Sequence, residues 1–233
     1  MQLRDRPSPN HGPRPAGGSV DMLVLHYTGM QTAAEALDRL ASPEAQVSAH
    51  YLIEEDGTPW RLVPEARRAW HAGVSCWGGK RDINDRSIGI ELVNPGHEFG
   101  YRDFPEAQMA ALEALCREIL ERHPIPPRHV LGHSDVAPQR KADPGERFDW
   151  RRLARHGIGF WPDAALHAGP PADIAGLQRL LARIGYETPQ SGVLDPATRQ
   201  VITAFQRHFR PARCDGTPDA ETAALIAALA AGV

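Results

Sequence analysis

Three side chains that can take part in catalysis lie close together in the segment GHSDVAPQRKADPG, residues 132–145. His133 is followed by Lys141 eight positions later and by Asp143 ten positions later, and two prolines restrict the backbone of this segment. A catalytic zinc ion commonly has three His or carboxylate ligands and keeps a fourth position for water. His133 and Asp143 could therefore be two ligands of such an ion.

A third ligand is expected at the end of a buried strand. Residues 22–25 form a short apolar run without alternation, which is typical of a strand buried on both faces. His26 follows this run, and strand ends in α/β domains face the binding crevice. Spacing alone leaves the assignment open, because the chain has 11 histidines. Asp135 is an alternative carboxylate ligand, although an Asp side chain at such a position more often caps a turn.

Strands and helices alternate around these residues. Thr32 and Glu35 form a capping box that predicts a short helix, and the apolar spacing of residues 104–122 predicts a longer amphipathic one. This alternation predicts an α/β domain built in layers. Strand-like composition is found in residues 22–25, 49–53, 59–63, 87–93 and 128–132.

The chain divides into four predicted parts. Residues 1–18 are rich in proline and predict an extended arm, and residues 19–156 form the main domain. Residues 157–171 read as a Gly- and Pro-containing linker, and residues 172–233 as a module of three short helices. A repeated GxxDxxT pattern places Asp195 and Asp219 as N-caps of two of these helices. Because few contacts should cross a linker, we expect the main domain to stay soluble without the module.

Composition limits the class of partner and the compartment. The chain is 42% hydrophobic and 24% charged, with a net charge of −3, which favours a globular protein and argues against a nucleic-acid partner. The three cysteines, Cys76, Cys116 and Cys214, lack metal-site spacing and are expected to be reduced thiols, with Cys116 in the core. We expect no transmembrane segment, a monomer, and a cytoplasmic location as the sequence stands. An export signal removed from it would instead indicate the periplasm or envelope.

Five motifs carry a resemblance to a known family. LVLHYT, VSAHYLI, AWHAG, NDRSIGIEL and GHSDVAPQRKADPG occur in this order between about residues 20 and 150. Together they resemble the zinc-dependent N-acetylmuramoyl-L-alanine amidases of the AmpD and AmiD group, which are related to the peptidoglycan recognition proteins. The resemblance implies a mixed central β-sheet flanked by helices. It also implies hydrolysis of the amide between N-acetylmuramic acid, or its anhydro form, and L-alanine in peptidoglycan or muropeptides.

The resemblance assigns a role to each catalytic position. One zinc ion per chain would be held by His26, His133 and Asp143, and would lower the pKa of a bound water from about 15.7 toward roughly 7. Glu91 would move the proton from this water to the leaving nitrogen. Lys141 would stabilise the negative oxygen that develops on the amide. Retention of all five residues favours an enzyme over a non-catalytic recognition protein; a zinc peptidase acting within the stem peptide is a further alternative.

Substrate contacts are less strongly indicated. His50 and His71 could contact substrate, support the metal ligands, or fill the rim of the site. Trp70 and Trp77 could form an aromatic wall for the sugar, although tryptophan more often packs in a core. We expect His50, Trp70 and His71 to bind substrate.

The C-terminal module carries a second resemblance. The run GVLDPATRQVITAFQ, residues 192–206, is similar to the three-helix peptidoglycan-binding domain that is attached to many cell-wall hydrolases. The resemblance implies that the module binds the cell wall. The alternative is a helical cap that only stabilises the main domain.

Overall fold

A six-stranded sheet forms the centre of the computed structural model, which describes residues 1–162 and 173–232. Strands β4, β9, β3 and β10 run parallel to one another, whereas β5 pairs antiparallel with β4, so the sheet is mixed, as predicted. Its order is β1 (Arg4–Asp5), β5 (Pro59–Arg61), β4 (Tyr51–Ile53), β9 (Ser87–Leu92), β3 (Met22–Tyr27) and β10 (Val130–Gly132).

Helices flank this sheet, and two small antiparallel pairs of strands lie outside it. The pairs are β2 (His11–Pro13) with β6 (Arg67–Ala69), and β7 (Cys76–Trp77) with β8 (Lys80–Arg81). The α-helices are α1 (Ala33–Ala41), α2 (Gly96–Phe99), α3 (Glu106–Arg122), α4 (His133–Val136), α5 (Trp150–Arg155), α6 (Ile174–Ile184), α7 (Pro196–Phe209) and α8 (Ala220–Ala231). Single 3-10 turns occupy Pro43–Ala45, Ile83–Asp85 and Pro127–His129.

The predicted helix starts are confirmed. Thr32 and Glu35 cap α1 reciprocally, and the carboxylates of Asp195 and Asp219 accept first-turn amide hydrogens at α7 and α8. The predicted strand at residues 128–132 begins later, at Val130, because the prolines before it favour a 3-10 turn.

The central strand β3 is buried on both faces, as its composition predicted. Leu23 and Leu25 pack on one face against a cluster that includes residues of α3 and α5. Met22 and Val24 point to the opposite face, where a second cluster lies. All four are fully buried. His26 continues the alternation of Met22 and Val24, so it lies on the second face.

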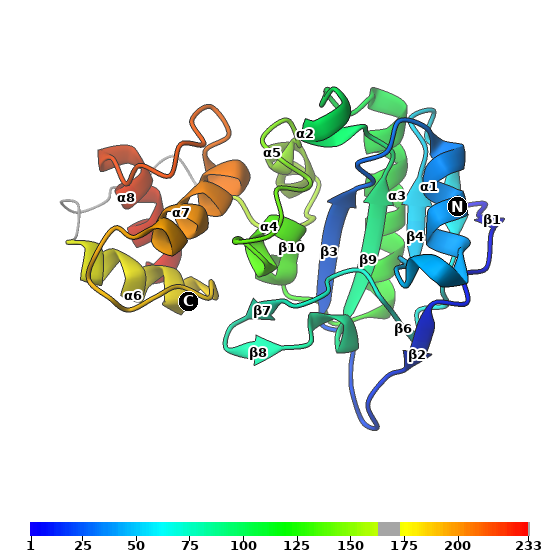
Figure 1. The fold of residues 1–233 in the computed structure, drawn as a ribbon, viewed down its shortest axis with the longest axis horizontal. Helices are drawn as coiled ribbons and strands as arrows, with labels where there is room; N and C mark the ends of the chain where they lie inside the picture. Colours follow the sequence, from blue (N-terminus) through cyan, green and yellow to red (C-terminus); the bar gives the residue numbers. More distant parts are fainter. Residues whose placement is uncertain (163–172, 233) are drawn as a thin grey trace.

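The second face is covered in part by the C-terminal helices. Figure 1 shows α6, α7 and α8 beside α4 and β10, which is one edge strand of the sheet. Helix α1 lies toward the other edge. Leu131 and Val136 of the main domain share one buried cluster with Leu181, Phe205 and other side chains of these helices. The expectation that few contacts cross between the two parts is therefore wrong. The predicted linker, residues 157–171, lies from residue 163 onward outside the described residues.

Trp77 belongs to this shared core and not to a sugar-binding wall. It is 5% exposed, and its ring lies edge-on to Tyr186 with centroids 4.9 Å apart. Gly185 has a φ of 135°, and a Cβ atom there would lie 2.5 Å from the Trp77 ring. The amide of Gly78 donates to the Gly185 carbonyl at 2.8 Å. Only glycine allows this close approach of the α6 C-terminus.

The N-terminal residues lie along the main domain in extended conformation. β1 pairs with β5 and β2 pairs with β6. The Arg14 guanidinium, which follows them, donates hydrogen bonds to four backbone carbonyls, those of Glu65, Asn84, Asp85 and Ser87.

The expectations about membrane-spanning helices and about the cysteines can be compared with the described residues. No helix there is both long and apolar enough to cross a bilayer. The three cysteines are free thiols, and Cys116 is fully buried in the core, as predicted.

Removal of residues 173–233 is therefore expected to destabilise the main domain. It would expose Met22, Val24, Trp77, Leu131 and Val136, and each buried large apolar side chain contributes roughly 1.5–3 kcal/mol. The sum is comparable with the whole stability of a typical domain, about 5–15 kcal/mol. Expression of the truncated chain should give insoluble protein, whereas the full chain should unfold thermally in one transition.

A soluble truncated chain with the melting temperature of the full chain would contradict this prediction. It would restore the sequence-based expectation of two independent parts.

Candidate metal centre

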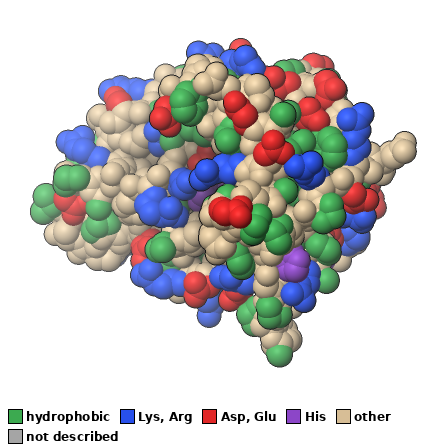
Figure 2. All heavy atoms as spheres, turned by 45° about the vertical axis from the view of Figure 1, so that its right-hand side comes forward, with side chains coloured by type: hydrophobic (Ala, Val, Ile, Leu, Met, Phe, Trp, Pro, Cys, Tyr) green, Lys and Arg blue, Asp and Glu red, His purple; other side chains and the backbone are tan. Residues whose placement is uncertain are grey.

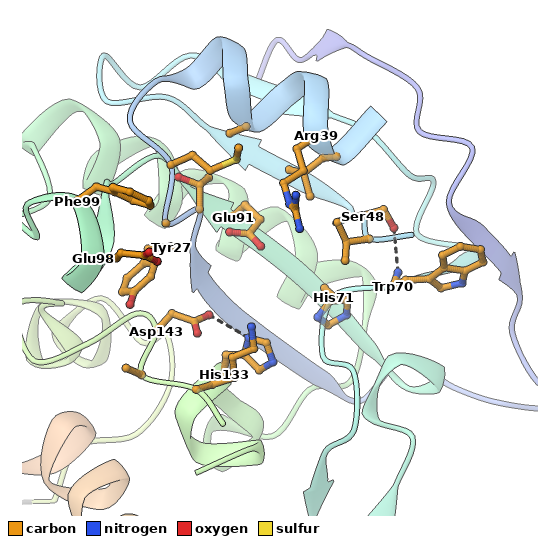
Figure 3. Close-up of a pocket in the computed structure, with 18 of the residues that line it drawn as sticks. Tyr27, Arg39, Ser48, Trp70, His71, Glu91, Glu98, Phe99, His133 and Asp143 are labelled. Carbon is orange, nitrogen blue, oxygen red and sulfur yellow. Dashed lines mark hydrogen bonds and ion pairs between the residues drawn. The ribbon is translucent and has the colours of Figure 1, made fainter. Parts of the chain in front are cut away.

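The three predicted metal ligands meet at one point. The Nδ1 atoms of His26 and His133 are 2.9 Å apart, and each lies 3.0 Å from Oδ2 of Asp143. All three side chains are buried, with at most 6% of each residue exposed. Figure 3 shows Asp143 and His133 pointing toward each other at the floor of a pocket. Among the described residues this is the group of His and acidic side chains that could hold a metal ion.

Parallel strand pairing brings the two histidines together. In the register of β3 with β10, Leu25 lies opposite Gly132, so the residues that follow them, His26 and His133, emerge side by side. Asp143 returns from the loop after α4, where its carbonyl accepts the Ser134 amide hydrogen at 2.9 Å. The positions of the three predicted ligands therefore depend on the pairing of β3 with β10 and on the loop that follows α4.

The hydrogen bonds of His26 determine which ring nitrogen is free. The Ser87 hydroxyl donates to the Ile83 carbonyl at 2.7 Å, so its oxygen accepts from Nε2–H of His71 at 3.0 Å. Nδ1 of His71 must then accept from Nε2–H of His26, at 3.1 Å. This order leaves the Nδ1 lone pair of His26 directed at the centre.

His133 is oriented in the same way. Its Nε2–H donates to the Ala72 carbonyl at 3.0 Å, which leaves its Nδ1 lone pair free. Burial lowers the pKa of His26 to about 4, so this imidazole is neutral at neutral pH, as a metal ligand must be.

The arrangement fits a zinc ion. Two imidazoles and one carboxylate are a common catalytic zinc set. Ligand atoms about 2.0–2.1 Å from one tetrahedral ion would be about 3.3 Å apart, a few tenths of an ångström more than the separations found here. Both imidazoles already have their second nitrogen hydrogen-bonded, which fixes the rings for coordination.

Glu91 lies beside the centre on the same face of the sheet. It is opposite His26 in the β3–β9 register, and its Oε2 is buried without a hydrogen-bond partner among the described residues. Burial, with a smaller contribution from Asp143, raises the pKa of Glu91 well above its usual value. A carboxyl group held in this state is suited to accept and then release a proton near neutral pH.

A cavity of about 680 Å³ opens above these groups. Figure 2 shows a hollow near the middle of one face, with Lys or Arg side chains beside a histidine. The cavity lining includes the predicted ligands His133 and Asp143, and also Tyr27, Arg39, Trp70, Glu91, Arg140 and Lys141. Lys141 is an exposed residue of this lining.

The three predicted substrate contacts lie in different places. Trp70 and His71 line the cavity, so a substrate contact for these two stays a prediction. His50 does not line it. It is fully buried, its Nδ1 accepts the Gly89 amide hydrogen at 2.9 Å, and its Nε2 lies 3.1 Å from the Arg67 carbonyl. This position favours a structural role for His50 between the strands.

Several supporting residues were not found from the sequence. Gly89 carries no side chain because a Cβ atom there would lie 2.4 Å from the His71 ring, and a glycine within a strand is a recognised sign of such close approach. Asn84 accepts the amide hydrogens of His71 and Ala72, and nothing in its sequence context indicates this.

Asp135 is not a ligand, since its Oδ2 accepts the Gly132 amide hydrogen at 2.8 Å, as expected for a cap.

Comparisons with known proteins agree with this geometry. A family model described as N-acetylmuramoyl-L-alanine amidase matches residues 16–146, and one described as putative peptidoglycan binding domain matches residues 171–226. The N-acetylmuramoyl-L-alanine amidase AmiD of Escherichia coli (strain K12) is 43% identical over 233 residues, covering 90% of this chain and 82% of AmiD.

Two further matches differ in how much of this chain they cover. The 1,6-anhydro-N-acetylmuramyl-L-alanine amidase AmpD of Enterobacter cloacae is 36% identical over 170 residues, covering 66% of this chain and 89% of AmpD. A structure of E. coli AmiD with the substrate anhydro-N-acetylmuramic acid-L-Ala-D-gamma-Glu-L-Lys matches with a TM-score of 0.83 at 41% identity. It covers 94% of this chain and 90% of AmiD.

The hydrogen-bond chain through His71 leads to a prediction about metal affinity. His71→Phe keeps a flat ring against Gly89 but removes the acceptor that fixes His26, so zinc affinity should fall about 10- to 100-fold. Competition with a chromophoric chelator measures this. His26→Ala is the reference for loss of the centre and should bind zinc more weakly still. If His71→Phe bound zinc as the wild type does and only raised KM, His71 would be a substrate contact instead.

Proposed function

The chain belongs to the N-acetylmuramoyl-L-alanine amidase family, and we propose that His26, His133 and Asp143 hold one zinc ion at its active site. The family's reaction is hydrolysis of the amide between N-acetylmuramic acid and L-alanine. One observation carries the proposal: two buried imidazoles, each with Nε2–H already donated, direct their Nδ1 lone pairs at the same carboxylate oxygen. A zinc ion bound there would polarise a water molecule and make it nucleophilic at neutral pH.

Glu91 is the proposed proton carrier. Its carboxylate accepts a proton from the attacking water as the new C–O bond forms at the amide carbon, and it passes that proton to the L-alanine nitrogen as the C–N bond breaks. The absence of a hydrogen-bond partner for its buried Oε2 among the described residues supports this role, because that oxygen is free to accept. The raised pKa of Glu91 brings its proton affinity closer to that needed at neutral pH.

Lys141 is proposed to stabilise charge. Its side chain lines the cavity next to Asp143, and an ammonium group there attracts the negative charge that develops on the amide oxygen during attack. A positive group that meets charge only in the transition state raises turnover more than ground-state affinity.

We infer that muropeptides with an anhydro sugar are substrates. Both named relatives support this: AmpD is named for the 1,6-anhydro form, and AmiD has been solved with an anhydro-muropeptide. A cavity of about 680 Å³ is in the size range of small-molecule sites. Residues 171–226 match the family described as putative peptidoglycan binding domain, and this match supports binding of the peptidoglycan polymer as well. Monomeric state and compartment stay predictions.

Glu91→Gln is expected to keep zinc and lose turnover. The amide is nearly isosteric with the carboxylate but cannot accept the proton, so kcat should fall on the order of 10² to 10⁴-fold. Steady-state hydrolysis of a purified anhydro-muropeptide gives kcat, and metal analysis of the same sample confirms loading. Wild-type turnover in a fully loaded variant would show that Glu91 is only a structural carboxylate.

The bond that is cut can be identified directly from products. Incubation with anhydro-muropeptide and, side by side, with intact sacculi should release a free stem peptide that begins with L-alanine, detected by mass spectrometry. Release from both substrates would fit an enzyme that accepts both sugar forms. Cleavage within the stem peptide, with L-alanine still attached to the sugar, would identify a zinc peptidase and contradict the proposal.

A further inference from the structure

Asp135 is a buried carboxylate that connects two parts of the molecule and does not face the cavity. It is fully buried. Its Oδ1 accepts the hydroxyl hydrogen of Tyr186 at 2.6 Å, and its Oδ2 accepts from Nδ1–H of His208 at 2.7 Å and from the Gly132 amide at 2.8 Å. Burying a carboxylate is costly unless several donors surround it, so these three bonds are needed together.

The bond to Gly132 fixes the start of α4. Gly132 is the N-cap of this four-residue helix, His133 is its first residue, and Asp135 reaches back from the third position. The amide of Ser134, two positions after Gly132, donates to the carbonyl of Asp143 at 2.9 Å. One helical turn therefore positions the backbone of two metal ligands, and the Asp135 carboxylate holds that turn in place.

Both side-chain donors to Asp135 come from the C-terminal helices. Tyr186 lies just after α6 and His208 lies in α7, and each is at most 3% exposed. Their rings are held by the main domain in turn: Trp150 stacks on His208 with centroids 3.8 Å apart, and Trp77 lies edge-on to Tyr186. Short, buried contacts of this kind leave the donors little freedom.

We propose that Tyr186 and His208 are positioning residues of the metal centre, acting through Asp135 on His133. The C-terminal helices would then support the His133 turn from the side that does not face the cavity, in addition to any contact with the cell wall. This inference rests on the proposed zinc centre. It predicts that zinc affinity responds to two side chains that neither belong to the ligand group nor line the cavity.

Two single substitutions remove one donor each. Tyr186→Phe deletes only the hydroxyl, and His208→Phe keeps a ring to stack on Trp150 but cannot donate. Each should weaken zinc binding about 10-fold, the low end of the effect seen when residues that support a metal ligand are changed. Competition with a chromophoric chelator gives the zinc Kd in the full chain. The absorption spectrum of the cobalt-loaded protein reports the ligand geometry independently of activity.

Ile226→Val is the matched control. Ile226 is fully buried in the same shared core, in α8, and is not bonded to Asp135. It should lower thermal stability without changing the zinc Kd or the cobalt spectrum. His208→Asn tests rescue, because the Asn amide nitrogen can occupy the position of Nδ1 and donate to Asp135. It should bind zinc more tightly than His208→Phe.

The outcomes separate the two proposals. If the wild-type chain binds no zinc, the metal centre itself is wrong. If the wild type binds zinc tightly and both Tyr186→Phe and His208→Phe bind it equally well, the centre stands and the positioning role is overturned. A fall in zinc affinity in Ile226→Val as large as in Tyr186→Phe would also overturn it, since the effect would then follow from general destabilisation. Tyr186→Phe, the smallest change, decides the question if His208→Phe does not fold.

Discussion

The parallel pairing of β3 with β10 is the constraint on which the site depends. Because Leu25 lies opposite Gly132, the residues that follow them, His26 within β3 and His133 directly after β10, lie side by side. Neighbouring strands of a sheet lie about 4.8 Å apart, close enough for two imidazoles to approach one point. The same argument extends to β9, where the register brings Glu91 beside His26 on the face that carries the cavity. A slip of one residue would turn these side chains to the opposite face.

That face of the sheet is shared between chemistry and packing. Met22 and Val24 pack against the C-terminal helices, whereas His26, next on the same face, belongs to the proposed metal centre. The cavity lining contains none of the described residues of these helices, but their buried donors Tyr186 and His208 reach Asp135, two positions after His133. A segment that resembles a wall-binding module is in this chain also part of the enzyme's core. Binding to polymer and support of the catalytic site are compatible roles for it.

The sequence predicted the elements and the ligands better than it predicted their surroundings. A buried strand and a proline-rich loop pointed to His26, His133 and Asp143 but left the assignment open, and the resemblance to the amidase family then selected these three. The capped helices were found because capping is a local signal. The relay from His26 through His71 to Ser87 was missed because it joins separate segments through side-chain hydrogen bonds. The sequence left the role of Trp77 open between a sugar-binding wall and core packing for the same reason: its partner, Tyr186, is more than one hundred positions away. His50 looked like a site residue in its motif, and only the structure shows its ring fully enclosed.

The most direct test of the account is to determine which ring nitrogens bind the metal. Long-range proton–nitrogen NMR spectra of the zinc-loaded protein, with His26 and His133 assigned by substitution, distinguish a metal-bound, a protonated and a free imidazole nitrogen. The hydrogen bonds to His71 and Ala72 predict that both rings coordinate through Nδ1 and keep the proton on Nε2. Coordination through Nε2 of either ring, or no change in their spectra on adding zinc, would contradict the account.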